Sequence, residues 1–121
     1  MSAFRSLADL PLLAIWDGVR ARTVEGRELT FAVVELDPLG AVGEHQHPNE
    51  QIGMVVRGTL TFTIGGETRE LVAGDTYNIP ANVPHDARAG AGGAVAIDVF
   101  APVRADWDRF APQAPARPVW P

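Results

Sequence analysis

The chain has 121 residues, of which 46% are hydrophobic and 21% charged, and this composition is typical of one soluble globular domain. Its formal net charge of −5, with no basic stripe, argues against nucleic acid as a partner. The absence of cysteine excludes disulfides and thiolate metal ligands. No segment has the long apolar run of a signal peptide or a membrane span, so we expect a cytoplasmic protein without membrane contact.

From the N-terminus onward, short stretches rich in Val, Thr, Ile and Phe alternate with turns that contain Gly, Pro or Asn, which indicates an all-β protein. Residues 1–25 contain a short apolar patch broken by Pro11 and Asp17, and we expect them to be a leader that precedes the fold. The expected strands are Leu29–Leu36, Gly43–His47, Gln51–Val56, Thr59–Ile64, Glu67–Leu71, Thr76–Ile79, His85–Ala89 and Ala94–Phe100.

The turns and the C-terminal end complete the expected domain. Gly65 and Gly66 separate two of the strands and predict a two-residue hairpin turn. Residues 103–110 could form a short helix, and four prolines in the last eleven residues predict an extended tail. Short strands at such close spacing favour a single small barrel or sandwich. We therefore expect one domain over residues 1–121, with its barrel core at about 26–101 and a tail at 102–121.

The three histidines of the chain fall into one pattern. His45 and His47 are two residues apart on an expected strand, so their side chains should project to the same face. Gln51 begins the next expected strand, and His85 begins a distant one. Ligands from three such strands can converge only if the sheet curves round on itself, as in a small barrel. The pattern predicts one divalent transition metal ion, with Zn or Ni favoured and Mn or Fe also acceptable.

Two segments around these residues resemble the two motifs of the cupin family. GEHQHPNEQIGMVVRG (43–58) resembles the first motif, and GDTYNIPANVPH (74–85) resembles the second. The resemblance implies a jelly-roll barrel, the double-stranded β-helix, whose metal is held by His45, His47, Gln51 and His85. In the second motif the usual glycine is Asn82, a residue that tolerates the left-handed conformation a turn needs.

Gln51 stands where the family usually has glutamate, and Glu50 should point to the opposite face of a regular strand. Three histidines and one glutamine are electrically neutral, so a divalent ion would keep its full charge. Such an ion is a stronger Lewis acid and costs more to oxidise, which favours non-redox chemistry over an oxygenase. The alternative is a purely structural metal, although structural sites are usually closed and four-coordinate.

The last expected strand has two contrasting faces. One face is aliphatic, and the other places a carboxylate and an aromatic ring among alanines: Val95, Ile97 and Val99 against Ala94, Ala96, Asp98 and Phe100. Asp98 fits either a cavity wall or a solvent-facing position near a strand end. Arg104, two residues beyond Pro102, could be a surface charge or could fold back over the barrel mouth.

The segment DVFAPVRADW (98–107), together with the two motifs, resembles the KdgF-type cupins of pectin and alginate breakdown. These open and ketonise the ring of 4,5-unsaturated uronates, which are acidic sugars. The resemblance implies that Asp98 is a catalytic acid/base, that Phe100 is a substrate-binding pocket wall and that Arg104 is a catalytic and substrate-binding contact. The segment departs from the family at Ala101, where serine is usual.

Other functions remain compatible with the sequence. A cupin scaffold hosts many chemistries, so a dioxygenase or an isomerase acting on another small molecule is one alternative. A non-catalytic sugar-binding protein is a second alternative, and a metal that only stabilises the fold is a third. We expect a homodimer, because the aliphatic strand face and the aromatic, proline-rich tail both need cover.

Overall fold

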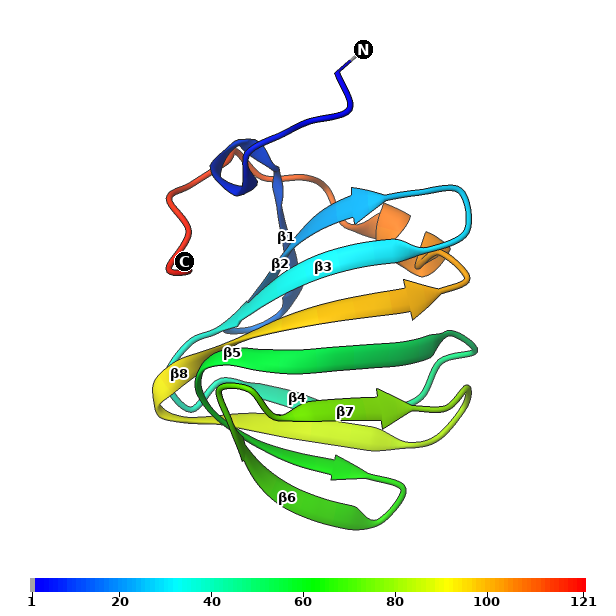
Figure 1. The fold of residues 1–121 in the computed structure, drawn as a ribbon, viewed down its shortest axis with the longest axis vertical. Coiled ribbons are helices and arrows are strands. Elements are labelled where there is room, and N and C mark those ends of the chain that lie inside the picture. Colours follow the sequence, from blue (N-terminus) through cyan, green and yellow to red (C-terminus); the bar gives the residue numbers. More distant parts are fainter. Residues whose placement is uncertain (1) are drawn as a thin grey trace.

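The computed structural model describes residues 2–121, and their regular elements are β-strands and two short 3₁₀ helices (Figure 1). The all-β fold class predicted from the sequence is confirmed. In chain order the elements are the 3₁₀ helix η1 (Leu7–Asp9), β1 (Leu12–Trp16), β2 (Val19–Glu25), β3 (Thr30–Leu36), β4 (Ala41–His45), β5 (Glu50–Ile64), β6 (Glu67–Val72), β7 (Thr76–Ile79), β8 (His85–Ala101) and the 3₁₀ helix η2 (Ala105–Arg109).

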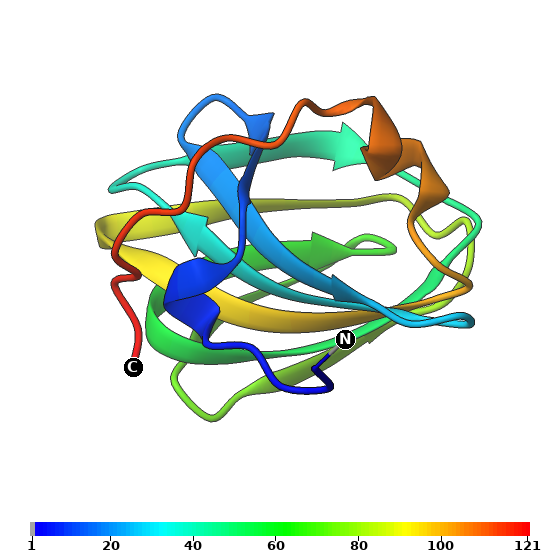
Figure 2. The same cartoon turned by 90° about the horizontal axis from the view of Figure 1, so that it is seen from above.

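Two long strands, β5 and β8, pair along their whole length and belong to both layers of the fold. The C-terminal half of β8 pairs with β3, and the N-terminal half pairs with β4. β7 and β6 pair with the first and second halves of β5. One layer is therefore β1-β2-β3-β8-β5-β7 and the other is β4-β8-β5-β6. Figure 2 shows how these strands wrap around the interior. Within residues 2–121 no pairing joins the edge strands, so the expected barrel is an open jelly roll.

The two long strands bend where Gly58 and Gly93 face each other. Both glycines have positive φ, 76° and 77°, and the pairing register shifts on either side of Gly58. A Cβ atom on Gly58 would lie 2.1 Å from the carbonyl oxygen of Gly93, so neither a side chain nor a straight strand fits here. The sequence predicted a separate strand on each side of Gly58 and on each side of Gly93. That prediction is wrong, because each glycine forms a bend within a continuous strand.

Residues 1–25 are not a leader outside the core, because they contain β1 and β2. Asp17 and Gly18 form the two-residue turn between these strands, and Gly18 has the positive φ of 76° that such a turn requires. Val19 and Ala21 are buried, and β2 pairs with β3 over seven residue pairs. The Asp17-Gly18 pair is the local sequence signal for this hairpin.

Several local predictions are confirmed. Gly65 and Gly66 have φ values of 55° and 86° and link β5 to β6 as a tight hairpin. Residues 105–109 form a short helix of the 3₁₀ type. Asn82 adopts the left-handed conformation, with a φ of 62°. The strand expected at 43–47 is displaced toward the N-terminus, since β4 covers Ala41–His45 and leaves His47 in the following loop.

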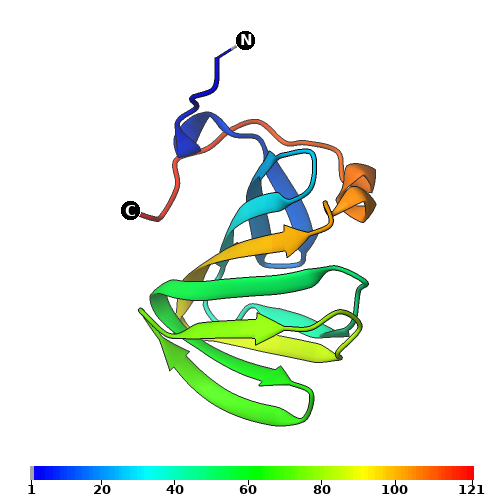
Figure 3. The ribbon, with the colours of Figure 1, turned by 45° about the vertical axis from the view of Figure 1, so that its right-hand side comes forward.

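The core lies between the two layers and contains Val55, Leu60, Phe62 and Ile79, all buried. After η2 the chain runs back past β1 toward the opposite end of the molecule (Figure 3). Gln113 exchanges backbone hydrogen bonds with Leu12 on the way. No helix in residues 2–121 combines the length and apolar character needed to cross a membrane. The assignment of the whole chain to one domain stays a prediction.

Candidate metal centre and active site

The structure brings the three histidines together inside the fold. His45 ends β4 and pairs directly with His85, the first residue of β8. His47 lies in the loop that leads to β5. One potential ligand atom from each ring lies within 4.8 Å of the other two. The convergence of the three histidines that the sequence pattern predicted is present, although His47 reaches it from the loop after β4 and not from the expected strand.

Backbone carbonyls set the tautomer of each ring. In all three histidines Nδ1 lies 2.8–3.0 Å from a carbonyl oxygen two residues away. Since a carbonyl can only accept, Nδ1 carries the hydrogen, and Nε2 keeps a free lone pair. The carbonyls thus orient the rings as the outer partners of metal-binding histidines usually do.

The chemistry of this group fits a divalent transition metal. Nε2 of His85 is buried and has no hydrogen-bond partner among the described residues. Burial lowers the pKa of His85 to about 4, and burial is also the main cause of the lowered pKa of His47. Both rings are therefore neutral at physiological pH, with lone pairs turned inward. A buried, unpartnered acceptor is costly, and a metal ion at this point would satisfy it.

The Gln51 side chain lies between the histidines and Asp98. Its Nε2 donates to Oδ1 of Asp98 at 3.0 Å, and its Oε1 lies 3.2 Å from Nε2 of His47. Because a carboxylate accepts hydrogen bonds, the amide nitrogen must face Asp98 and the amide oxygen must face the histidines. Gln51 is buried, whereas Glu50 is exposed, so the expectation that Glu50 points away is confirmed.

Asp98 is buried on β8 next to this group. Its Oδ1 accepts hydrogen bonds from the Tyr77 hydroxyl at 2.5 Å and from Gln51. Burial raises the pKa of the Asp98 carboxyl, although the Tyr77 and Gln51 hydrogen bonds partly oppose this. Burial, followed by the charge of Asp98, raises the pKa of Tyr77 well above its usual value. Of the two positions left open for Asp98 by the sequence, the structure shows the interior one.

Phe100 and Arg104 also line the cavity, and Phe100 lies next to His47. The Arg104 guanidinium lies 4.7 Å from the centre of the Phe100 ring and 4.4 Å from the Trp107 ring. Its Nε and Nη2 donate to the two carboxylate oxygens of Asp106 at 3.0 and 2.9 Å, which lowers the Asp106 pKa. Arg104 is buried, so it folds back over the interior. Sequence reasoning missed Trp107 and Asp106.

Asn49 connects the metal loop to the segment that carries Arg104. Its Nδ2 donates to the backbone oxygens of Pro102 and Val103 at 2.6 and 3.1 Å, and the Asn49 side chain is buried. The backbone nitrogen of Arg104 donates in turn to the Thr30 hydroxyl at 3.0 Å. No sequence pattern singled out Asn49, because its partners lie more than fifty residues away.

All seven residues selected from the sequence line one cavity of about 370 Å³. Its lining combines polar side chains, those of the histidines, Gln51 and Asp98, with apolar ones such as Val19 and Leu60. Its volume is that of a site for a small molecule. The structure thus places these residues together, while their catalytic and binding roles remain predictions.

Comparison with known proteins agrees with this architecture. The Cupin domain family matches residues 32–100. The pectin degradation protein KdgF of Dickeya dadantii is 32% identical over 101 residues, which cover 82% of this chain and 92% of that protein. The chain belongs to the cupin family and is a KdgF-like cupin. The cupin fold expected from the sequence is therefore confirmed.

Two further relatives extend the comparison of this KdgF-like cupin. The structure of KdgF from Halomonas sp. superimposes with a TM-score of 0.79 at 29% identity, covering 88% of this chain and 98% of that one. H2HPP isomerase of Bacillus subtilis is 40% identical over 80 residues, which cover 64% of this chain. Those residues span only 34% of the isomerase, so the chain matches about a third of that protein's length.

Proposed function

We propose that this cupin opens and ketonises 4,5-unsaturated uronates, the acidic sugars released by pectin or alginate lyases. The observation that carries the proposal is the cavity, where three histidines and Gln51 face the same space as the buried carboxylate of Asp98. The near full-length similarity to a pectin degradation protein supports the substrate class.

The substrate sets out what the site must do. An unsaturated uronate is an enol ether within a hemiacetal ring, and its carboxylate lies beside the double bond. When the hemiacetal opens, the bond from C1 to the ring oxygen breaks, the C1 hydroxyl loses its proton and an enol remains at C5. Ketonisation then removes the enol proton and adds one to C4. The reaction is an isomerisation, so it needs no oxidant or reductant.

Asp98 is placed to move the proton in the ketonisation step. Its Oδ1 is held by two donors, while Oδ2 accepts no hydrogen bond from any described residue. Burial raises the Asp98 pKa, which brings a carboxyl closer to the range in which it can both give and take a proton. Asp98 therefore donates to C4 from Oδ2 and takes back a proton from the enol. Positioned acid–base catalysis contributes about 10²–10⁴-fold.

Arg104 is placed to bind the substrate carboxylate. Asp106 occupies its Nε and Nη2, and Nη1 has no partner among the residues described. The two aromatic rings hold the guanidinium plane in place, so the free donor keeps a fixed direction. Phe100 forms the adjacent wall, and its ring also meets His47 edge-on at 5.8 Å between centroids.

His45, His47, His85 and Gln51 are the residues that would hold the metal ion. A divalent ion bound there would act as a Lewis acid and stabilise negative charge that develops on the substrate oxygens. Nitrogen and amide-oxygen donors suit Zn or Ni, and Mn or Fe also fits. The neutral ligand set favours a metal that does not change its oxidation state.

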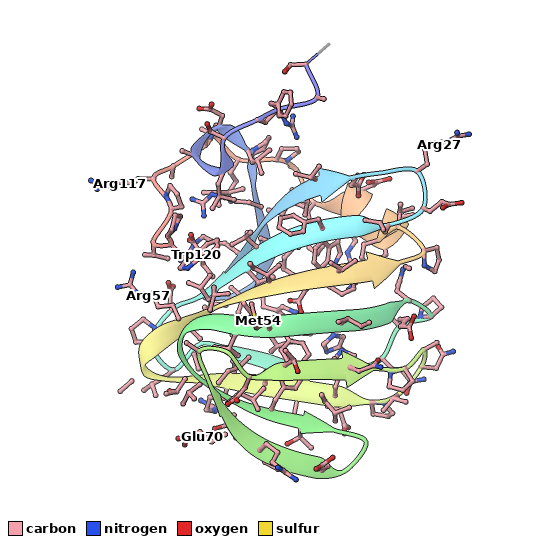
Figure 4. The ribbon with its side chains drawn as sticks, in the orientation of Figure 1. Arg27, Met54, Arg57, Glu70, Arg117 and Trp120 are labelled. Carbon is pink, nitrogen blue, oxygen red and sulfur yellow. The ribbon has the colours of Figure 1, made fainter. Side chains whose placement is uncertain are left out.

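The homodimer and the cytoplasmic location stay predictions. For the dimer, Ile52 and Met54 on β5 are 51% and 38% exposed and pair in the sheet with Val99 and Ile97 of β8. This outward aliphatic face is where a second copy would pack. Figure 4 shows Met54 on that face of the layer.

The proposal is tested by mixing the metal-loaded protein with lyase-generated unsaturated uronates and following the loss of their ultraviolet absorbance. We expect the protein to accelerate the loss and a chelator to suppress the acceleration. An unchanged rate with both galacturonate- and alginate-derived substrates would contradict the proposal.

A second candidate is an isomerase that acts on another small enolisable acid. The 40% identity to part of H2HPP isomerase favours it, because the matched portion covers 64% of this chain. The same metal and carboxylate groups would serve such a reaction. Turnover of a non-sugar enol, with none of the uronates, would favour this candidate.

A further inference from the structure

Three residues form one row across neighbouring strands beneath the cavity. Gly53 on β5 pairs with Tyr77 on β7 on one side and with Asp98 on β8 on the other. Paired residues in adjacent strands project to the same face, so Tyr77 and Asp98 both point inward from either side of Gly53. Their side chains meet across the glycine, where the Tyr77 hydroxyl donates to Oδ1 of Asp98.

Gly53 is what lets the two side chains meet. A Cβ atom at this position would lie 2.3 Å from Oδ1 of Asp98 and 2.4 Å from the Tyr77 hydroxyl oxygen. No real Cβ tolerates such distances, so any other residue would push the pair apart. The φ angle of Gly53 is not positive, which leaves the close approach of these side chains as the reason for a glycine here.

The hydrogen bond gives the two oxygens of Asp98 different environments. Tyr77 and Gln51 both donate to Oδ1, and no described residue donates to Oδ2. A carboxylate held by two donors on one oxygen cannot rotate without breaking both bonds. We propose that Tyr77 is a positioning residue that, with Gln51, anchors Oδ1 of Asp98 so that Oδ2 delivers the proton. The inference rests on the function proposed above.

A purely structural role for Tyr77 predicts something different. The ring packs against Phe62, with 4.6 Å between centroids, and belongs to the buried core. Phenylalanine would keep this packing and lose only the hydroxyl. Tyr77→Phe therefore separates the two roles, since packing alone would leave catalysis unchanged.

The decisive experiment compares Tyr77→Phe with Thr76→Val in metal-loaded protein. Thr76 is the exposed neighbour on β7, and its replacement removes a hydroxyl from the outer face. We expect kcat for the uronate to fall by about 10- to 100-fold in Tyr77→Phe, the range for losing one hydrogen bond to a charged group. KM and metal content should stay at wild-type values, Tm should fall only by the cost of one lost hydrogen bond, and Thr76→Val should behave as wild type throughout. A wild-type kcat in Tyr77→Phe would overturn the inference.

A second measurement does not depend on activity. Tyr77 is the only tyrosine in the chain, so biosynthetic 3-fluorotyrosine gives a single ¹⁹F resonance from this position. We expect Asp98→Asn to move the resonance and Thr76→Val to leave it in place. An unchanged ¹⁹F chemical shift in Asp98→Asn would also overturn the inference. If wild type fails to convert uronates, the proposed function fails, and the fluorine signal alone decides whether Tyr77 holds Asp98.

Discussion

Two buried polar clusters lie on opposite sides of the β2-β3-β8-β5 layer, and they differ in what faces them. The inner cluster consists of the three histidines, Gln51, Asp98 and Tyr77 and opens into the cavity. The outer cluster consists of Arg22 and Glu35, and the C-terminal tail covers it. Arg22 donates to Glu35 and to the backbone oxygen of Ala116, and Glu35 accepts from the backbone nitrogen of Val119.

This difference indicates that the inner cluster is a binding site and that the outer cluster holds the C-terminal tail on the fold. In the inner cluster, Nε2 of His85 and Oδ2 of Asp98 have no hydrogen-bond partner among the described residues, and both side chains line the cavity. In the outer cluster the Arg22 and Glu35 side chains bind each other and the backbone of the tail, and Nε of Arg22 has no hydrogen-bond partner within residues 2–121. Figure 4 shows the tail residue Trp120 on the same side of the molecule as Arg57, which binds the oxygen of Val119. Substitutions in the inner cluster should therefore affect catalysis, and substitutions in the outer cluster should affect the free energy of unfolding.

The largest effect is expected from Asp98→Asn. The change keeps the shape of the side chain but removes its ability to shuttle a proton, so kcat should fall by about 10²–10⁴-fold. Metal content, measured by elemental analysis, should stay at the wild-type level. Turnover at the wild-type rate would show that Asp98 does not transfer the proton. It would also contradict the assignment of catalysis to the inner cluster.

Arg22→Met should lower the free energy of unfolding and leave the cavity residues unaffected. Glu35 would remain buried without its main partner, and breaking a buried ion pair from one side costs about 3–5 kcal/mol of unfolding free energy. Urea denaturation measures the loss, and kcat per folded molecule should be unchanged. A drop in kcat at full folding would show that the outer cluster also serves the site.

Metal addition should stabilise the protein only through the inner cluster. At free metal of about one hundred times Kd, binding to the folded state adds about 2.7 kcal/mol. The rise in Tm should disappear in His85→Ala and persist in Arg22→Met. If His85→Ala keeps the full rise, the ion binds elsewhere.

The smallest effect is expected from deleting residues 114–121. The tail contributes two hydrogen bonds to the outer cluster, but its removal lets water reach Arg22 and Glu35. The loss of unfolding free energy should be about 1–2 kcal/mol. Kinetics with the uronate serve as the control, because altered KM would mean that the tail shapes the cavity.

The sequence predicted much of the site because its residues carry the chemistry themselves. The spacing of His45 and His47, the distant His85 and the polar face of Asp98 are all visible along the chain. The contacts of Tyr77 were not, because they depend on the register of β7 and β8 against Gly53. That register is set by the three-dimensional pairing of distant strands.

In the fold, too, the features with local sequence signals were predicted, and those that depend on distant strands were not. Alternating residues and the Gly65-Gly66 turn predicted most strands, since these signals are local. At Gly58 and Gly93 the sequence predicts that a strand ends. Only the opposing backbone shows that each strand continues through its bend. Asp106 and Trp107 became part of the site through the return of the chain over the cavity, which no short-range pattern reports.

The most direct test of proton delivery by Asp98 is the stereochemistry of the product formed in D₂O. A carboxyl fixed on one side of the cavity should place deuterium at C4 from one face only, so ¹H NMR should show a single diastereomer. Spontaneous ketonisation should give both. An enzymatic product with deuterium on both faces, at the same ratio as the spontaneous reaction, would contradict the account.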